Sequence, residues 1–216
     1  MLKLIFNILG VLTLTHAPFS YTATPMPNPD QALQMLVEGN THFVNNENVH
    51  RSYLEEAKDA MLQKQTPIAA IVGCSDSRVP PELIFDRGLG ELFVVRDAGN
   101  VIGPIEMDSV EFAVISLKVP LVIVMGHQNC GAVGAALLGR KNVPELDNIY
   151  PLLDQALKKC NSKGTDVLIN AIECNVKMGV ATLKNSPSIA PLLKENKVKI
   201  VGAYYEMTSG KVTLIE

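Results

Sequence analysis

The chain has 216 residues, of which 47% are hydrophobic and 5% aromatic, and its formal net charge at pH 7 is -3. This length and hydrophobic content suit one globular domain, and because Trp is absent its core must be largely aliphatic. The slightly negative charge argues against nucleic-acid binding, which usually requires a basic face.

The N-terminal segment differs from the rest of the chain. Lys3 is followed by an apolar run from Leu4 to Leu14, after which small and polar residues take over. This layout is typical of a secretory signal peptide, and the run is too short to span a bilayer comfortably. We predict a signal peptide at 1–23, ending at Ala23, and export to a bacterial periplasm with no stable membrane span after its removal. A retained anchor and an N-terminal helix packed on the core are the alternatives.

The remaining residues, 24–216, are expected to form a single domain that begins with a helical arm. Apolar residues at helical spacing predict a helix over 30–46, with Asp30 as its N-cap, although Gly39 weakens the pattern in the middle. A second helix is predicted over 52–64.

Short apolar runs after this arm predict strands. The first three are continuous rather than alternating, as expected for parallel strands covered on both faces. Helical patterns separate the runs, and Thr208–Gly210 predicts a hairpin turn between the last two. The fold class is therefore α/β, with a mostly parallel central sheet flanked by helices and an antiparallel C-terminal edge hairpin. The predicted strands are 68–72, 91–95, 121–125, 198–203 and 211–215, and the predicted helices between them are 106–118, 131–139 and 164–184.

Four cysteines are present, and they fall into two kinds. Cys160 and Cys174 lie in helix-like sequence, where a cysteine is usually a small buried hydrophobe, and in an exported protein they could also pair. Cys74 and Cys130 have polar and charged neighbours, which indicates a chemical role for these two.

Two of the apolar runs end in a glycine and then a reactive side chain. Gly73 precedes Cys74, and Gly126 precedes His127. Parallel α/β sheets form their sites at the carboxyl ends of strands, so Cys74 and His127 should meet if the two strands are neighbours. Cys130, at the start of the next helix, can point to the same place, and a helix N-terminus favours the thiolate. Two thiolates and an imidazole suit Zn²⁺ and leave a fourth position open for catalysis.

The sequence resembles a known family at these residues. Cys-Ser-Asp-Ser-Arg at 74–78 and Gly-His-x-x-Cys-Gly at 126–131 look like the signature of the β-class carbonic anhydrases. The similarity extends from about Pro29 to the C-terminal hairpin and includes ELFVVRDAGNV at 91–101. It implies a zinc lyase that reversibly hydrates carbon dioxide to bicarbonate and a proton.

The resemblance also implies roles for particular residues. A zinc-bound hydroxide would attack carbon dioxide, with Asp76 orienting it and Arg78 holding Asp76 ionised and turned away from the metal. The family forms homodimers or homotetramers with sites at the subunit interface. The zinc ligands would be Cys74, His127 and Cys130, the catalytic dyad Asp76 and Arg78, and the substrate-binding residues Gln65 (from a neighbouring subunit), Val79 and Gly131.

Two other functions remain open from the residues alone. Cys74 could be a nucleophile with His127 as its base. The chain could also be a non-enzymatic zinc or redox-buffer protein of the envelope, in which Asp76 closes the metal site as a fourth ligand. Zinc content and the effect of chelation on activity separate these functions from the anhydrase.

Overall fold

The structure is a computed structural model that describes residues 25–49, 64–139, 143–159 and 166–215. The predicted signal peptide at 1–23, nearly all of the predicted helix at 52–64, and Cys160 lie outside these ranges. Among the described helices, none is both long enough and apolar enough to cross a membrane.

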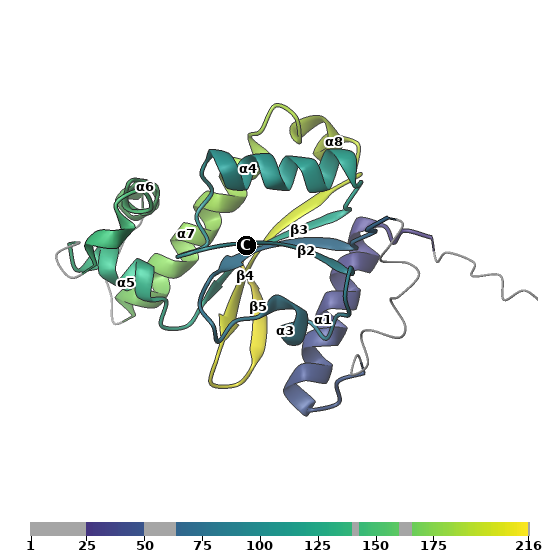
Figure 1. Ribbon diagram of the computed structural model, residues 1–216, viewed down its shortest axis with the longest axis horizontal. Coiled ribbons are helices and arrows are strands. Elements are labelled where there is room, and N and C mark those ends of the chain that lie inside the picture. Colours follow the sequence, from purple (N-terminus) through teal and green to yellow (C-terminus); the bar gives the residue numbers. More distant parts are fainter. Residues whose placement is uncertain (1–24, 50–63, 140–142, 160–165, 216) are drawn as a thin grey trace, which may run out of the picture.

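A five-stranded sheet forms the centre of the molecule, in the order β2-β1-β3-β4-β5 (Figure 1). The first four of these strands are parallel, and β5 pairs antiparallel with β4 across a turn in which Gly210 has a φ of 74°. The predicted fold class is confirmed, including the C-terminal edge hairpin. The strands are β1 (Ala69–Cys74), β2 (Leu92–Asp97), β3 (Leu121–His127), β4 (Lys199–Glu206) and β5 (Lys211–Ile215).

Helices connect and cover the strands. The helix predicted over 106–118 begins at Pro104 and changes to a π-helix at Phe112. The helix predicted over 131–139 is confirmed and ends at Leu137. The helix predicted over 164–184 is confirmed from Val167 to Lys184, and residues 164 and 165 lie outside the described ranges. The α-helices are α1 (Pro29–Asn45), α3 (Pro81–Ile84), α4 (Pro104–Glu111), α5 (Gly131–Leu137), α6 (Tyr150–Lys159), α7 (Val167–Lys184) and α8 (Ala190–Lys194), with the π-helix η1 (Phe112–Ser116) and the 3-10 helix η2 (Pro144–Leu146).

Both faces of the central strands β1 and β3 are buried, because alternate residues of each strand pack against different helices. Strand β2, which was also expected to be covered on both faces, lies at the edge of the sheet and is only partly buried. Ile71 and Ile123 belong to a cluster on the face covered by α1, α3, α5 and α6. Val72 and Val124 belong to a second cluster that includes residues of α4 and η1 on the opposite face. This arrangement explains why the central strands are continuous apolar runs. Figure 1 shows the sheet between α4 on one side and α1 and α3 on the other.

Helix α1 differs in detail from its prediction. Asn28, not Asp30, is the N-cap: its side chain accepts from the Gln31 N–H at 2.9 Å, and the Gln31 side chain accepts from the Asn28 N–H. Pro29 then occupies the first helical position, where its missing N–H costs nothing. Gly39 does not interrupt the helix; it allows close packing, since a Cβ there would overlap the carbonyl of Phe85.

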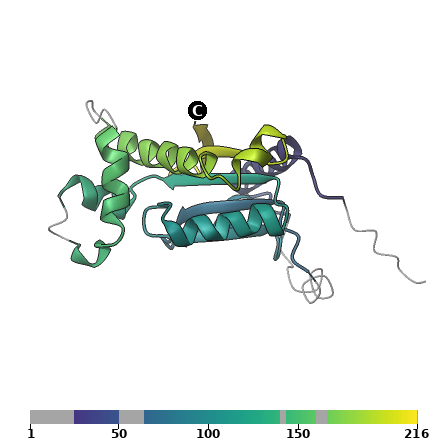
Figure 2. The same ribbon diagram turned by 90° about the horizontal axis from the view of Figure 1, so that it is seen from above.

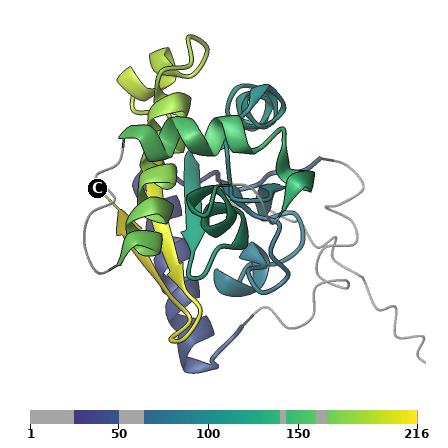
Figure 3. The same ribbon diagram turned by 90° about the vertical axis from the view of Figure 1, so that its left-hand side faces the viewer.

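The parallel strands all point to one end of the sheet, and α5 and α6 lie at that end. Figures 2 and 3 show the two helices there, with α7 passing beside them along the sheet. Helix α5 contacts both α6 and α7. The residues that end β1 and β3 therefore lie at the end of the sheet where α5 and α6 are found.

Candidate metal centre

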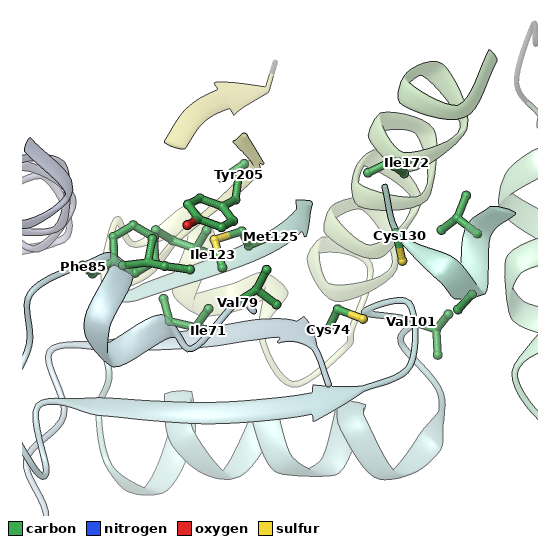
Figure 4. Packing of buried hydrophobic residues seen from close by; sticks show 14 of the residues in the cluster. Ile71, Cys74, Val79, Phe85, Val101, Ile123, Met125, Cys130, Ile172 and Tyr205 are labelled. Carbon is green, nitrogen blue, oxygen red and sulfur yellow. The ribbon is translucent and has the colours of Figure 1, made fainter. Parts of the chain in front are cut away.

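Adjacent parallel strands bring the predicted metal ligands together. Cys74 is the last residue of β1 and His127 the last of β3, and these strands pair in parallel. Cys130 is the N-cap residue of α5, which starts directly after it. The Sγ atoms of both cysteines and a ring nitrogen of His127 all lie within 4.8 Å of one another, and all three residues are buried. Figure 4 shows the two sulfurs facing the same space at the end of the sheet.

The His127 ring is prepared to act as a ligand. Its Nδ1 lies 2.9 Å from the carbonyl oxygen of Gln128. A carbonyl can only accept, so Nδ1 carries the proton and Nε2 keeps its lone pair. Nε2 is buried and has no hydrogen-bond partner among the described residues. Metal-binding histidines commonly donate their second ring N–H to a carbonyl in this way. The free Nε2 beside two sulfurs therefore fits a bound metal cation.

The two sulfurs differ in acidity. A hydrogen bond from Cys130, supported by the N–H of Gly99 at 3.3 Å, lowers the pKa of Cys74 to about 4 despite its burial. The same hydrogen bond, together with burial, raises the pKa of Cys130. The helix N-terminus was expected to favour the Cys130 thiolate. Backbone N–H groups of α5 do act in that direction, but the neighbouring Cys74 anion outweighs them. Because a metal binds both sulfurs as thiolates, its binding would release the proton of this hydrogen bond.

Asp76 and Arg78 form a bidentate pair beside the ligands. Arg78 Nε donates to Asp76 Oδ1 at 2.9 Å and Nη2 donates to Oδ2 at 2.6 Å. The Arg78 guanidinium is the main cause that holds the pKa of Asp76 well below its usual range. Asp76 Oδ2 also lies 4.0 Å from His127 Nε2, beyond hydrogen-bond distance. The structure thus places an anionic carboxylate next to the ligand set and joins it to a guanidinium.

Arg96 contacts the same loop and was not singled out from the sequence. It lies on β2, and its Nε donates to the Cys74 carbonyl at 2.9 Å while Nη2 donates to the Asp76 carbonyl at 2.6 Å. One side chain therefore fixes the backbone on both sides of Ser75. Its position in the ELFVVRDAGNV segment was the only signal, because bonds to backbone carbonyls leave no trace in residue types.

Asp97 is a second carboxylate near the ligands, and it too was not predicted. It lies opposite Cys74 in the β1–β2 register. Its Oδ1 accepts from the Val101 N–H at 2.9 Å, and its Oδ2 is buried without a hydrogen-bond partner among the described residues. Burial raises the pKa of Asp97 to about 7. The Asp97 carboxyl therefore forms a hydrogen bond within the loop that follows β2, in surroundings that disfavour its charge.

The residues predicted to bind substrate lie in different surroundings. Val79 is buried in the core cluster that contains Cys74, as Figure 4 shows. Gly131 is the exposed first residue of α5, and Gln65 is exposed just before β1. Their roles toward the substrate remain predictions. Cys174 is disulfide-bonded, in agreement with the expectation that it could pair.

Comparison with known proteins agrees with this geometry. A family model described as carbonic anhydrase matches residues 69–212, which include all three ligands. The carbonic anhydrase of Mycolicibacterium smegmatis is 38% identical over 195 residues, which cover 88% of this chain and 95% of the relative. The carbonic anhydrase of Synechococcus elongatus is 33% identical over 200 residues, covering 85% and 71%.

Solved structures show the same fold. A Coccomyxa β-carbonic anhydrase in complex with acetazolamide superposes with a TM-score of 0.69 at 25% identity, covering 85% of this chain and 86% of that one. One of two tetrameric β-carbonic anhydrases from Sordaria macrospora superposes with a TM-score of 0.67 at 22% identity, covering 86% and 97%.

Proposed function

The chain belongs to the β-class carbonic anhydrases, and from this premise we propose that it hydrates carbon dioxide reversibly with a zinc ion held by Cys74, His127 and Cys130. The observation that carries the proposal is the convergence of these three side chains, with the unpartnered Nε2 of His127 among them. Two thiolates and one imidazole are a zinc set, and three protein ligands leave one position for catalysis.

Zinc, when bound, supplies the Lewis acidity that turns water into a hydroxide nucleophile near neutral pH. The protein's ligands set the strength of this Lewis acidity. Thiolates donate more charge to a metal than imidazoles do, so Cys74 and Cys130 should weaken the acidification. We therefore expect hydration to be faster at alkaline pH than at mildly acidic pH.

Asp76 supports the reaction as a hydrogen-bond acceptor. Because Arg78 keeps its pKa low, the carboxylate is ionised throughout the working pH range and has no proton to donate. It would accept a hydrogen bond from the attacking oxygen and so orient that oxygen toward carbon dioxide. Arg78 is a positioning residue: by binding both carboxylate oxygens it keeps Asp76 from taking the fourth metal position.

The substrate and the assembly follow from the family. Carbon dioxide offers little to hydrogen-bond, so Val79 and the Gly131 backbone would line a small apolar site, which Gln65 completes from a neighbouring subunit. A homodimer or homotetramer is supported by exposed apolar side chains on α4 and η1, namely Ile105, Phe112 and Ile115. Sedimentation of the purified protein tests the assembly, and a monomer would contradict it.

Export to the periplasm remains a proposal. The N-terminal sequence supports it, and so does the disulfide at Cys174, because disulfides persist in oxidising compartments. Zinc bound to Cys74 and Cys130 would protect their sulfurs from oxidation there. N-terminal sequencing of the mature protein tests cleavage after Ala23.

Carbon dioxide hydration by the purified protein tests the function directly. Turnover should be lost on treatment with a zinc chelator and return when zinc is restored. A nucleophilic cysteine enzyme would show no carbon dioxide hydration, and a non-enzymatic zinc protein would bind the metal without turnover.

A further inference from the structure

Asn175 is a buried polar residue on an otherwise apolar helix face. It lies in the middle of α7, and its neighbours Ala171, Ile172, Val176 and Gly179 are all buried. Asn175 itself is 4% exposed. A side-chain amide in such surroundings destabilises the fold unless it forms hydrogen bonds. The presence of an amide here therefore requires a specific partner.

That partner is the loop that follows β2. Asn175 Nδ2 donates to the carbonyl oxygen of Gly99 at 2.7 Å, across 76 residues of sequence. The N–H of Gly99 in turn donates to Cys74 Sγ at 3.3 Å. One residue, Gly99, thus joins the α7 amide to a metal-ligand sulfur.

The conformation of Gly99 makes this link specific. Its φ is 91°, which side-chain-bearing residues rarely adopt, and a Cβ there would approach Ala132 to 3.2 Å. Asp97 closes the same loop from within by accepting the Val101 N–H. Asn175 is the side chain that holds the loop from outside, through its hydrogen bond to Gly99.

We infer that Asn175 is a positioning residue which, by fixing Gly99, holds a backbone N–H against the Cys74 sulfur and sets how much charge that sulfur donates to the metal. The inference rests on the proposed zinc function and adds a residue outside the ligands and the Asp76–Arg78 pair. An N–H···S hydrogen bond draws electron density from a thiolate, so the metal stays more electrophilic. Partners of this kind tune metal affinity and activity by about 10- to 100-fold.

Asn175→Leu tests the inference, because leucine has a similar size but cannot donate a hydrogen bond. Ile172→Val is the matched control, since it changes the same helix face and leaves the bond to Gly99 intact. Cobalt is substituted for zinc in the full chain, and the thiolate-to-metal charge-transfer band is recorded for each protein. Zinc affinity is measured in parallel by competition with a chelator.

Loss of the N–H···S bond should make the sulfur more electron-rich and shift the band to lower energy in Asn175→Leu alone. Because the bound metal would be less electrophilic, turnover should fall by about 10- to 100-fold. Asn175→Ser, which keeps a shorter donor, should give an intermediate shift and serves if the leucine variant does not fold.

An unchanged band in a folded Asn175 variant would overturn the inference, and so would an equal shift in Ile172→Val. Failure of the proposed function looks different: the unmodified protein would then bind no zinc or hydrate no carbon dioxide.

Discussion

Asp76 and Arg78 are two residues apart and face each other through two parallel hydrogen bonds, so that both oxygens of the carboxylate are engaged by one guanidinium. The Arg78 N–H adds a third bond to Oδ1 at 3.0 Å. The side chain of Asp76 is only 16% exposed, whereas that of Arg78 is 57% exposed. The carboxylate is thus held on the protein side of the pair, next to His127.

Replacing Arg78 with alanine should lower hydration activity by about 10- to 100-fold, the usual effect of losing a residue that orients a metal site. Asp76 would then be free to turn to the metal, and its pKa would rise toward the ordinary value near 4. Arg78→Lys is the control, because it keeps the charge but not the two parallel bonds, and it should lose less. Stopped-flow hydration assays measure both, and full turnover in Arg78→Ala would refute this role.

The same pair predicts a pH dependence. Because the folded-state pKa of Asp76 is depressed, the pair stabilises the fold above the unfolded value near 4 and loses this effect as pH falls below it. When the pH falls below about 4, the free energy of unfolding should therefore decrease less in Arg78→Ala than in the unmodified protein. Thermal unfolding of both proteins at a series of pH values measures this difference. An equal loss of stability in the two proteins on acidification would contradict the prediction.

Asp97 should affect stability with the opposite sign. Its folded-state pKa of about 7 lies above the unfolded value, so the folded protein binds this proton more tightly. Stability should therefore fall as pH rises from about 4 to about 7 and then change no further from this group. Asp97→Asn cannot titrate, so its unfolding free energy should depend less on pH across that window. Urea unfolding of both proteins across this pH range measures the difference, and an identical pH dependence would count against it.

Gly39→Ala should destabilise the protein although alanine is the better helix former. A Cβ at this position would overlap the Phe85 carbonyl, and overpacking of this kind costs about 1–3 kcal/mol. Gly134→Ala in α5 is the matched control, because a Cβ there meets only Leu168 at 3.9 Å. Urea unfolding should show a loss for the first variant and none for the second. If Gly39→Ala were as stable as Gly134→Ala, α1 would be able to move away from Phe85 at no cost in free energy, and the prediction would be wrong.

The sequence predicted the sheet and the ligands because each leaves a local pattern. Continuous apolar runs mark strands buried on both faces, and the reactive side chains stand directly after two of them. Cys74 and His127 could be placed together because parallel neighbours end at one edge. Helix α6 was missed, although Tyr150, Leu153 and Ala156 recur at helical spacing and would have revealed it.

Hydrogen bonds from side chains to distant backbone carbonyl groups could not be predicted from the sequence in this way. Arg96 and Asn175 both act on carbonyl groups far away in the sequence, and a carbonyl belongs to every residue type. Asn28 was overlooked as the N-cap of α1 because Asp30 is an equally good capping residue. The sequence did contain the signal that favours Asn28, because Pro29 suits the first helical position and Gln31 completes a capping box with Asn28.

X-ray absorption at the zinc edge of the purified protein tests the central claim most directly. We expect one zinc per chain bound by two sulfurs at about 2.3 Å and one imidazole nitrogen at about 2.0 Å, with a light atom from solvent as the fourth ligand. Removing Cys130 by Cys130→Ser should leave one sulfur. A zinc site with no sulfur, or with the same two sulfurs in Cys130→Ser, would contradict it.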